Sequence, residues 1–182
     1  MIIICITGMP GSGKSIVVEA ARSLNLPVYT MGDVIREEVL RQGSQLTPDN
    51  MNRVARELRE KYGSDIVARR IFEKIDKNTR IVVIDGLRSL DEKKYFETQG
   101  KVIVIAVHAS PKTRFSRLVK RGRPGDPSTW EQFVERDFNE LRFGIGDVIA
   151  LADYMVINEG DKEQTYNTAI HILSTIMGVA EK

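Results

Sequence analysis

The chain has 182 residues, 42% of them hydrophobic and 29% charged, which is the size and composition of one compact domain with a sizeable core. Its formal net charge of +2 is too small to predict binding to nucleic acid or to an anionic membrane from charge alone. One cysteine and two histidines argue against a disulfide framework, a zinc site and a Ser-His-Asp triad.

The chain begins with an apolar run at 2–7 that is rich in isoleucine and predicts a strand buried on both faces. Gly8 and Pro10 end this run, which is too short for a signal peptide or a membrane-spanning helix. We therefore expect a soluble cytoplasmic protein without a membrane partner.

Helical and strand patterns alternate along the rest of the chain. The strands predicted after the first are 27–30, 80–85, 101–108 and 154–158, and the predicted helices are 13–24, 32–41, 48–61, 64–76, about 89–98, 111–121, 128–142 and 162–178. Strands separated by helices predict an α/β fold with a five-stranded parallel sheet flanked by helices. The stretch 32–76 is long for one crossover and predicts a small helical lobe beside the sheet, within a single domain that spans 1–182.

Residues 8–15 read GMPGSGKS and fit G-x-x-x-x-G-K-[ST], the phosphate-binding P-loop, with a strand before it and a helix after it. Backbone N–H groups of such a loop converge on phosphate oxygens, and the helix N-terminus adds partial positive charge. Lys14 would reach the terminal phosphates, and the Ser15 hydroxyl would hold Mg²⁺. The ATP-binding residues predicted from this loop are Gly8, Gly11, Ser12, Gly13, Lys14 and Ser15.

The run RIVVIDG, residues 80–86, places Asp85 at the carboxyl end of a predicted central strand beside the P-loop. A carboxylate in that position can hold Mg²⁺, commonly through a water molecule, as the second acidic element of P-loop enzymes does. We predict that Lys14 and Asp85 are catalytic and that Ser15 and Asp85 are the metal ligands.

Two segments carry a family resemblance. DGLRS, residues 85–89, resembles the D-G-F-P-R segment of adenylate kinases, although Arg88 arrives one residue early; TMGDVIREEV, residues 30–39, resembles their S-T-G-D-x-x-R segment, with Met31 in place of threonine. The chain is similar to a nucleoside monophosphate kinase of the adenylate kinase type, and more closely to a group of archaeal predicted nucleotide kinases. The resemblance implies a P-loop NTPase fold whose lobe at 32–76 binds the acceptor through Gly32, Asp33, Arg36 and Arg88.

The arginines of that set also make a pair on physical grounds. Arg36 follows Asp33 by one helical turn, so both side chains project from the same face of a helix start. A guanidinium there and that of Arg88, after a neighbouring strand end, would form a two-armed clamp for a monophosphate.

Basic residues crowd the interval from 110 to 123, and Arg114, Arg117 and Arg121 share one helix face by their spacing. In kinases of the type resembled, a basic helix and a flexible break after the fourth strand form a lid that closes over the phosphates. We predict a lid at 111–142 without structural zinc. Its catalytic arginines are predicted to be Arg121 and Arg123, followed by Arg117, with Arg136 and Arg142 as further candidates. A solvated basic helix, or one that faces RNA or DNA, is the alternative.

The last predicted strand ends in LADYMVINEGD, residues 151–161, which resembles the A-D-x-V-I-x-N-x-G ending of dephospho-coenzyme A kinases. In those enzymes the following loop packs on the adenine of ATP. The resemblance implies that Asn158 and Gly160 bind ATP.

These residues predict an Mg²⁺-dependent nucleotide kinase that transfers the γ-phosphoryl group of ATP to a nucleoside monophosphate, with AMP as the first expectation. One alternative is a dephospho-coenzyme A-like kinase, in which Asp33 would act as base toward a ribose hydroxyl. Another is a nucleotide-binding regulatory or RNA-processing protein with weak ATPase activity.

Overall fold

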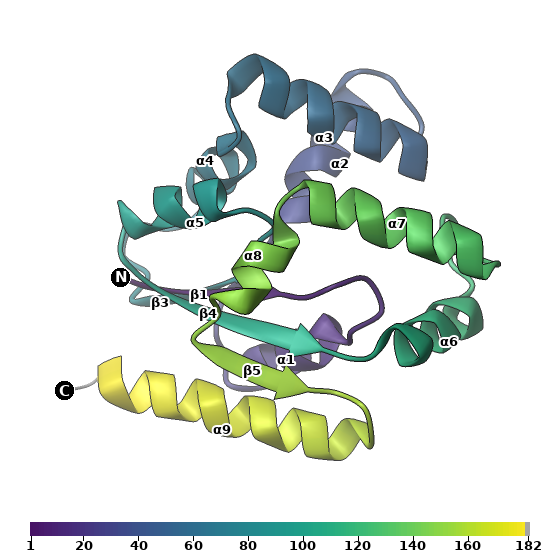
Figure 1. Cartoon of the computed structure of the whole chain (residues 1–182). Helices are drawn as coiled ribbons and strands as arrows, with labels where there is room; N and C mark the ends of the chain where they lie inside the picture. The colour runs from purple at the N-terminus through teal and green to yellow at the C-terminus, as the bar shows by residue number, and fades with distance from the viewer. Residues whose placement is uncertain (181–182) are drawn as a thin grey trace.

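Five parallel strands form one sheet at the centre of the molecule (Figure 1), in the computed structural model that describes residues 1–180. In chain order the elements are β1 (Ile2–Thr7), α1 (Lys14–Ser23), β2 (Val28–Thr30), α2 (Met31–Arg41), α3 (Pro48–Tyr62), α4 (Ile66–Phe72), β3 (Ile81–Asp85), α5 (Leu90–Glu97), β4 (Lys101–His108), α6 (Pro111–Arg121), α7 (Trp130–Arg142), α8 (Ile145–Ala150), β5 (Tyr154–Ile157) and α9 (Lys162–Ala180). The predicted α/β class is confirmed.

The strand order is β2-β3-β1-β4-β5, and every neighbouring pair is parallel. Ile4 of β1 lies in register with Val83 of β3 on one side and with Ile103 of β4 on the other. Because β1 is central, the loop that follows it opens at the carboxyl edge of the sheet, between the ends of β3 and β4. Ligands of open α/β sheets bind at this edge.

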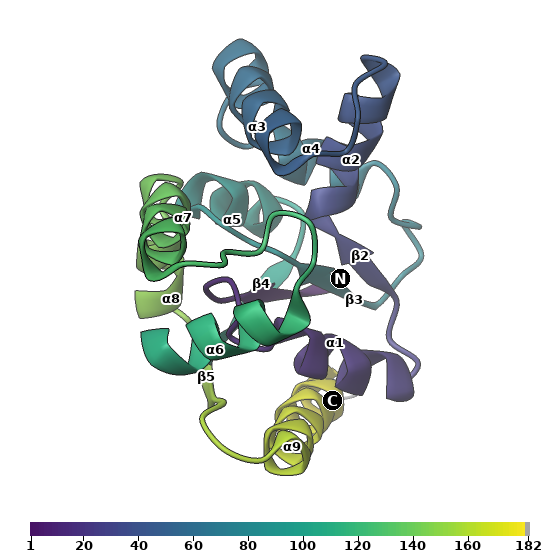
Figure 2. The same ribbon diagram turned by 90° about the vertical axis from the view of Figure 1, so that its right-hand side faces the viewer.

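The alternation of side chains along the strands builds two hydrophobic cores. Ile4 and Ile6 of β1 face the core under α1 and α9, whereas Ile3 and Cys5 face the opposite core, which α5, α8 and the helices α2–α4 complete. Figure 2 shows α1 and α9 on one side of the sheet, with α2, α3 and α4 together on the other. The predicted helical lobe beside the sheet is therefore present.

Side-chain caps fix where several helices begin. Thr47, Ser89, Ser110 and Thr129 each accept a hydrogen bond from the backbone N–H three residues on, at the starts of α3, α5, α6 and α7. These four caps fix the helix starts within the lobe, after the β3–α5 connection and at both helices of the lid region.

The structure departs from the predicted elements in two places. The helix predicted at 64–76 is limited to α4, and α8 was not predicted, because its six residues are too few to show a helical period beside the glycines of the segment GIGD. Within residues 1–180, none of the helices combines the length and apolar character needed to cross a membrane.

Candidate active site

The loop between β1 and α1 has a backbone that only glycine permits at three positions. Gly8, Gly11 and Gly13 have φ values of 145°, 81° and 97°. A Cβ at Gly8 would overlap the carbonyl oxygen of Val107, and one at Gly13 would overlap the side-chain amide of Asn158. The sequence therefore forms the loop that the P-loop motif predicts, closed against β4 and the end of β5.

Lys14 begins α1 and turns back over this loop. Its Nζ donates hydrogen bonds to the carbonyl oxygens of Gly8 at 2.5 Å and Met9 at 3.4 Å. Burial lowers the pKa of Lys14, and the carboxylates of Asp85 and Glu140 act in the opposite direction. The ammonium group thus lies inside the site, next to the backbone that would hold phosphate oxygens.

Asp85 ends β3 beside Lys14. Burial raises the pKa of Asp85, and the nearby Lys14 opposes that shift. Its Oδ1 atom is enclosed and has no hydrogen-bond partner within residues 1–180, and the same holds for the Ser12 hydroxyl. An enclosed carboxylate oxygen without a partner fits a hard cation such as Mg²⁺, which takes one or two protein oxygens together with substrate phosphates. Ser15, the second residue of α1, is exposed and offers the hydroxyl ligand that the motif predicts.

A cavity of about 300 Å³ opens in front of this loop, and we call it the phosphate cavity. Its lining includes the P-loop residues Gly8, Gly11 and Lys14, then Thr30, Gly32, Asp85 and Glu140, and four arginines, Arg36, Arg88, Arg121 and Arg136. The arginines come from α2, the β3–α5 connection, α6 and α7. We refer to these four side chains as the arginine wall.

Each arginine of the wall is paired with a carboxylate. Arg36 forms an ion pair with Asp33 on α2, and the Arg88 Nε lies 3.4 Å from the carboxylate of Glu140 on α7. The Asp126 carboxylate accepts from Arg121 at 2.5 and 2.8 Å and from Arg136 at 3.1 Å. Those hydrogen bonds hold the pKa of Asp126 well below its usual range.

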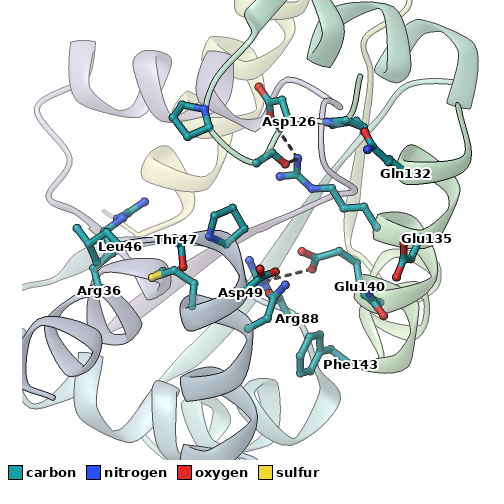
Figure 3. Close-up of a pocket in the computed structure, with 18 residues that line it drawn as sticks. Arg36, Leu46, Thr47, Asp49, Arg88, Asp126, Gln132, Glu135, Glu140 and Phe143 are labelled. Atoms are coloured by element: carbon teal, nitrogen blue, oxygen red, sulfur yellow. Dashed lines mark hydrogen bonds and ion pairs between the residues drawn. The ribbon is translucent and has the colours of Figure 1, made fainter. Parts of the chain in front are cut away.

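A second cavity of about 720 Å³ lies beside the first, between α3 and α7, and we call it the outer cavity. Arg36, Arg88, Arg136 and Glu140 line both. In Figure 3, Arg88 and Glu140 point toward one another with the ring of Phe143 next to them. The two cavities therefore share a charged boundary.

The connection between α6 and α7 closes over the outer cavity. At Gly125 (φ 83°) a Cβ would overlap the ring of Pro48, the first residue of α3. The predicted lid therefore touches the predicted acceptor lobe.

The arginine face of α6 turns inward. Arg114 is 4% exposed, donates to the Asp137 carboxylate at 2.7 and 2.6 Å and contacts the carbonyl oxygen of Pro10 in the P-loop at 3.2 Å. Arg117 donates to the carbonyl oxygen of Asn158 at 3.0 Å. The spacing of three and four residues does indicate one face, and this face contacts the P-loop through Arg114 and the end of β5 through Arg117.

Several predicted residues lie apart from both cavities. Asp33 is half exposed and lines neither one, and the same is true of Arg123 and Arg142 on the lid. Gly160 is exposed after β5. The roles predicted for Asp33, Arg123 and Gly160 stay predictions, without a contact to the cavities in the described chain.

The Asn158 side chain is buried against the P-loop. It is 2% exposed, and its side-chain amide donates to the carbonyl oxygen of Ser12 at 2.8 Å, while its oxygen accepts from Thr165 at 3.0 Å. Asn158 thus holds the P-loop backbone from the end of β5. The predicted contact with ATP stays a prediction.

Sequence reasoning did not identify Asp126 and Glu140, and it named Arg136 only among the further candidates. Asp126 had a local signal, a carboxylate in the break RGRPGDP after a basic helix. Glu140 had no local sequence signal, because its partner Arg88 lies on another element far away in the sequence.

Comparison with known proteins gives the family. A protein from Hyperthermus butylicus named "UPF0200 protein" is 54% identical over 97% of this chain and 96% of its own length. The chain belongs to the UPF0200 family. A UPF0200 protein of Methanocaldococcus jannaschii is 46% identical over all of this chain and 94% of its own. A family model described as "AAA domain" matches residues 7–134, from the P-loop into α7.

Solved structures share the fold of this UPF0200 protein. TT1252 from Thermus thermophilus superposes with a TM-score of 0.62 at 22% identity, covering 96% of this chain and 97% of its own. The shikimate kinase of Acinetobacter baumannii has a TM-score of 0.59 at 15% identity, covering 99% of this chain and 95% of its own. The chain therefore shares the α/β fold of these structures, in agreement with the P-loop NTPase fold that the resemblance implied.

Proposed function

We propose that this protein is a nucleotide kinase that transfers the γ-phosphoryl group of ATP to a nucleoside monophosphate, with AMP as the acceptor. The observation that carries the proposal is the position of Arg36 and Arg88. They reach the cavity that the P-loop and Lys14 also line, from two different elements. A single ATP needs the loop and the lysine, whereas two further guanidinium groups in the same cavity suit the phosphate of a second nucleotide.

The donor site would be the loop at residues 8–13 with Lys14. Its backbone N–H groups and the start of α1 would hold the ATP phosphates, and Lys14 would neutralise charge on the transferring group. Asp85 and Ser15 would hold Mg²⁺, which supplies further charge neutralisation when bound.

The acceptor site would be the boundary between the two cavities. An incoming phosphate would replace Asp33 and Glu140 as partners of Arg36 and Arg88, because a guanidinium binds phosphate in the same bidentate manner as a carboxylate. The outer cavity, about 720 Å³, falls within the range of small-molecule sites and would take the nucleoside. Asn52, Asn139 and the Phe143 ring line it and provide amide and aromatic surfaces for a base.

Phosphoryl transfer requires positioning and charge neutralisation more than covalent participation by the protein. Arg121 and Arg136 also line the phosphate cavity and would supply the remaining positive charge. Their partner Asp126 holds both guanidinium groups in place before a ligand arrives. This preorganisation supports transfer to an acceptor over simple nucleotide binding.

A hydroxyl acceptor is the second candidate, because it would need a base and Asp85 offers one. Burial raises the pKa of its carboxyl, whose Oδ1 has no partner in the described chain. The structurally similar shikimate kinases, and a gluconokinase from Sinorhizobium meliloti, are by name kinases of small molecules. Asp33, the base of the dephospho-coenzyme A alternative, is half exposed and paired with Arg36.

The RNA-facing alternative draws less support from the charges. Arg114 and Arg117 of α6 are engaged with Asp137 and Asn158, and Arg121 with Asp126, so these guanidinium groups do not form a free cationic stripe. Phosphate-backbone binding relies on accessible lysine and arginine side chains.

The test is phosphoryl transfer from ATP labelled at the γ-phosphate to a panel of AMP, dephospho-coenzyme A, shikimate, gluconate and water. The proposal expects label in ADP formed from AMP, and no transfer with Lys14→Met as the control protein. Label in dephospho-coenzyme A, shikimate or gluconate would establish the hydroxyl-acceptor alternative. Release of labelled inorganic phosphate alone would overturn transfer to an acceptor.

A further inference from the structure

A buried carboxylate outside both cavities, Glu92 on α5, contacts the backbone that carries Arg88. The Glu92 side chain is fully buried, at 0% exposure. Its Oε2 accepts a hydrogen bond from the backbone N–H of Arg88 at 2.9 Å, and its Oε1 accepts from the Arg59 guanidinium at 2.8 Å. Since a buried carboxylate is costly unless it is paired and hydrogen-bonded, these two donors determine where Glu92 lies.

The first contact differs from ordinary helix capping. Ser89 is the N-cap of α5, and its hydroxyl accepts from the Glu92 N–H at 3.2 Å. In a capping box the glutamate would return to the N–H of the cap residue itself. Here the carboxylate reaches one residue further and binds the N–H of Arg88. The helix start is therefore also a restraint on the backbone of an arginine in the phosphate cavity.

The second contact brings in the lobe. Arg59 lies on α3, and its guanidinium also donates to the carbonyl oxygen of Ala55 at 3.0 Å. The same group lies 5.1 Å from the centroid of the Phe143 ring, which lines the outer cavity. Arg59 thus connects the lobe helix with the Arg88 segment and with the end of α7.

We propose that Glu92 and Arg59 are positioning residues for the acceptor, coupling the placement of Arg88 to that of the lobe helix α3. Neither side chain lines a cavity, so their effect on a ligand passes through Arg88 and Phe143. The identity of the ligand as AMP rests on the proposed function, whereas the restraint on Arg88 is a property of the fold.

Glu92→Gln tests the proposal. Glutamine has one side-chain oxygen where glutamate has two, so it can accept from Arg59 or from the Arg88 N–H but not from both with full strength. We expect the KM for AMP to rise about tenfold, equivalent to one charge-assisted hydrogen bond, while the KM for ATP stays within about twofold. Exchange of the Arg88 amide hydrogen with deuterium, followed by NMR, should accelerate about tenfold for the same reason.

Glu38→Gln is the matched control. Glu38 is also a buried carboxylate, at 5% exposure, and pairs with Arg70 of another helix at 2.9 Å, but that pair lies inside the lobe. The Glu38→Gln substitution should lower the melting temperature as Glu92→Gln does, without changing the KM for AMP or the hydrogen exchange rate of the Arg88 amide. Arg59→Lys keeps the cation and should raise the KM for AMP less than Glu92→Gln.

An unchanged Arg88 exchange rate in folded Glu92→Gln would overturn the positioning role, as would equal KM increases in Glu92→Gln and Glu38→Gln. If Glu92→Gln does not fold, Arg59→Gln is expected to raise the KM for AMP in the same way, and an unchanged KM there would also overturn the proposal. Failure of the wild-type protein to bind AMP would contradict the proposed acceptor. The exchange experiment would then still decide whether Glu92 holds the Arg88 backbone.

Discussion

The P-loop and the arginine wall line the same cavity and come from different parts of the chain. The loop is backbone from consecutive residues, fixed by glycines at positive φ and by a buried asparagine. The wall consists of side chains from four elements, and each of its arginines is paired with a carboxylate. The loop is preformed, whereas Arg36 and Arg88 of the wall have carboxylate partners that an acceptor phosphate would replace.

This contrast has a consequence for specificity. Backbone N–H groups in a loop recognise phosphate with little dependence on what carries it, as expected for a donor site. A guanidinium group that leaves its carboxylate partner binds a ligand only if the ligand replaces the negative charge and the hydrogen bonds of that carboxylate. This requirement is expected for a selective acceptor site. Loss of Lys14 should therefore abolish reaction, while substitutions of Arg36 and Arg88 should weaken the acceptor more than the donor.

The largest expected effect belongs to Lys14→Met. Methionine keeps most of the side-chain volume and removes the ammonium group, so we expect kcat with ATP and AMP to fall about 10³-fold while the protein still folds. Steady-state kinetics and a thermal melt of the same preparation measure both quantities. Wild-type turnover in the variant would show that the loop is not the donor site.

Substitution of Arg136 should have the next largest effect. Its guanidinium lines both cavities, so Arg136→Ala should lower kcat about 10²-fold through lost transition-state charge stabilisation. Lys120→Ala removes an exposed cation from α6, which also carries Arg121, and should change kcat less than twofold. Equal losses in the two variants would point to overall charge instead of a defined contact.

The glycine loop can be probed with a matched pair of alanine substitutions. Gly13 and Gly43 both have positive φ, but a Cβ at Gly13 meets the Asn158 amide, while none of the described atoms lies within 4 Å of one at Gly43. Gly13→Ala should weaken ATP binding about tenfold or more, from backbone strain of about 1–3 kcal/mol and the displaced amide. Gly43→Ala should lower stability slightly and leave ATP affinity unchanged, as calorimetry can show. Equal ATP affinities in the two variants would contradict the role of the closed loop.

The smallest expected effect is on stability at acidic pH. Hydrogen bonds from Arg41, Arg70 and Gln42 lower the pKa of Glu38 from its usual 4.5 to about 2. Its folded-state pKa lies below the unfolded value, so its stabilising contribution is complete above about pH 4.5 and is lost as the pH falls toward 2. Urea unfolding across that pH range should show that the difference in free energy of unfolding between wild type and Glu38→Gln shrinks as the pH falls. Glu57→Gln, at an exposed carboxylate on α3, serves as the control. If the difference in free energy of unfolding between wild type and Glu38→Gln stays constant with pH, the lowered pKa of Glu38 would be refuted.

The sequence predicts the loop well because all of its determinants are local. Glycine spacing, the preceding apolar strand and the lysine at the helix start lie within about a dozen residues, and the five strands are separated clearly enough to give a parallel sheet. Arg36 and Arg88 could be named because each follows a recognisable segment. That both reach one cavity beside the P-loop depends on the strand order, which places β2 beside β3 and β3 beside β1.

The rest of the wall could not be predicted, since it depends on which helix faces which. Glu140 and Arg88 are in contact only because α7 packs across the β3–α5 connection. The expectation for Asn158 shows the same limit. Its segment was identified, but its hydrogen bond to Ser12 depends on how β5 and α9 pack beside the loop.

The central claim is that donor and acceptor occupy separate sites, the donor at the P-loop and the acceptor at Arg36 and Arg88, and calorimetric titration of Arg88→Ala tests it most directly. Each protein is titrated with AMP and, separately, with a non-hydrolysable ATP analogue. Loss of a desolvated arginine–phosphate contact of about 2–5 kcal/mol should weaken AMP binding about thirtyfold or more in Arg88→Ala, and likewise in Arg36→Ala. Binding of the ATP analogue should change less than threefold. Unchanged AMP affinity, or equal losses for both ligands, would contradict the account.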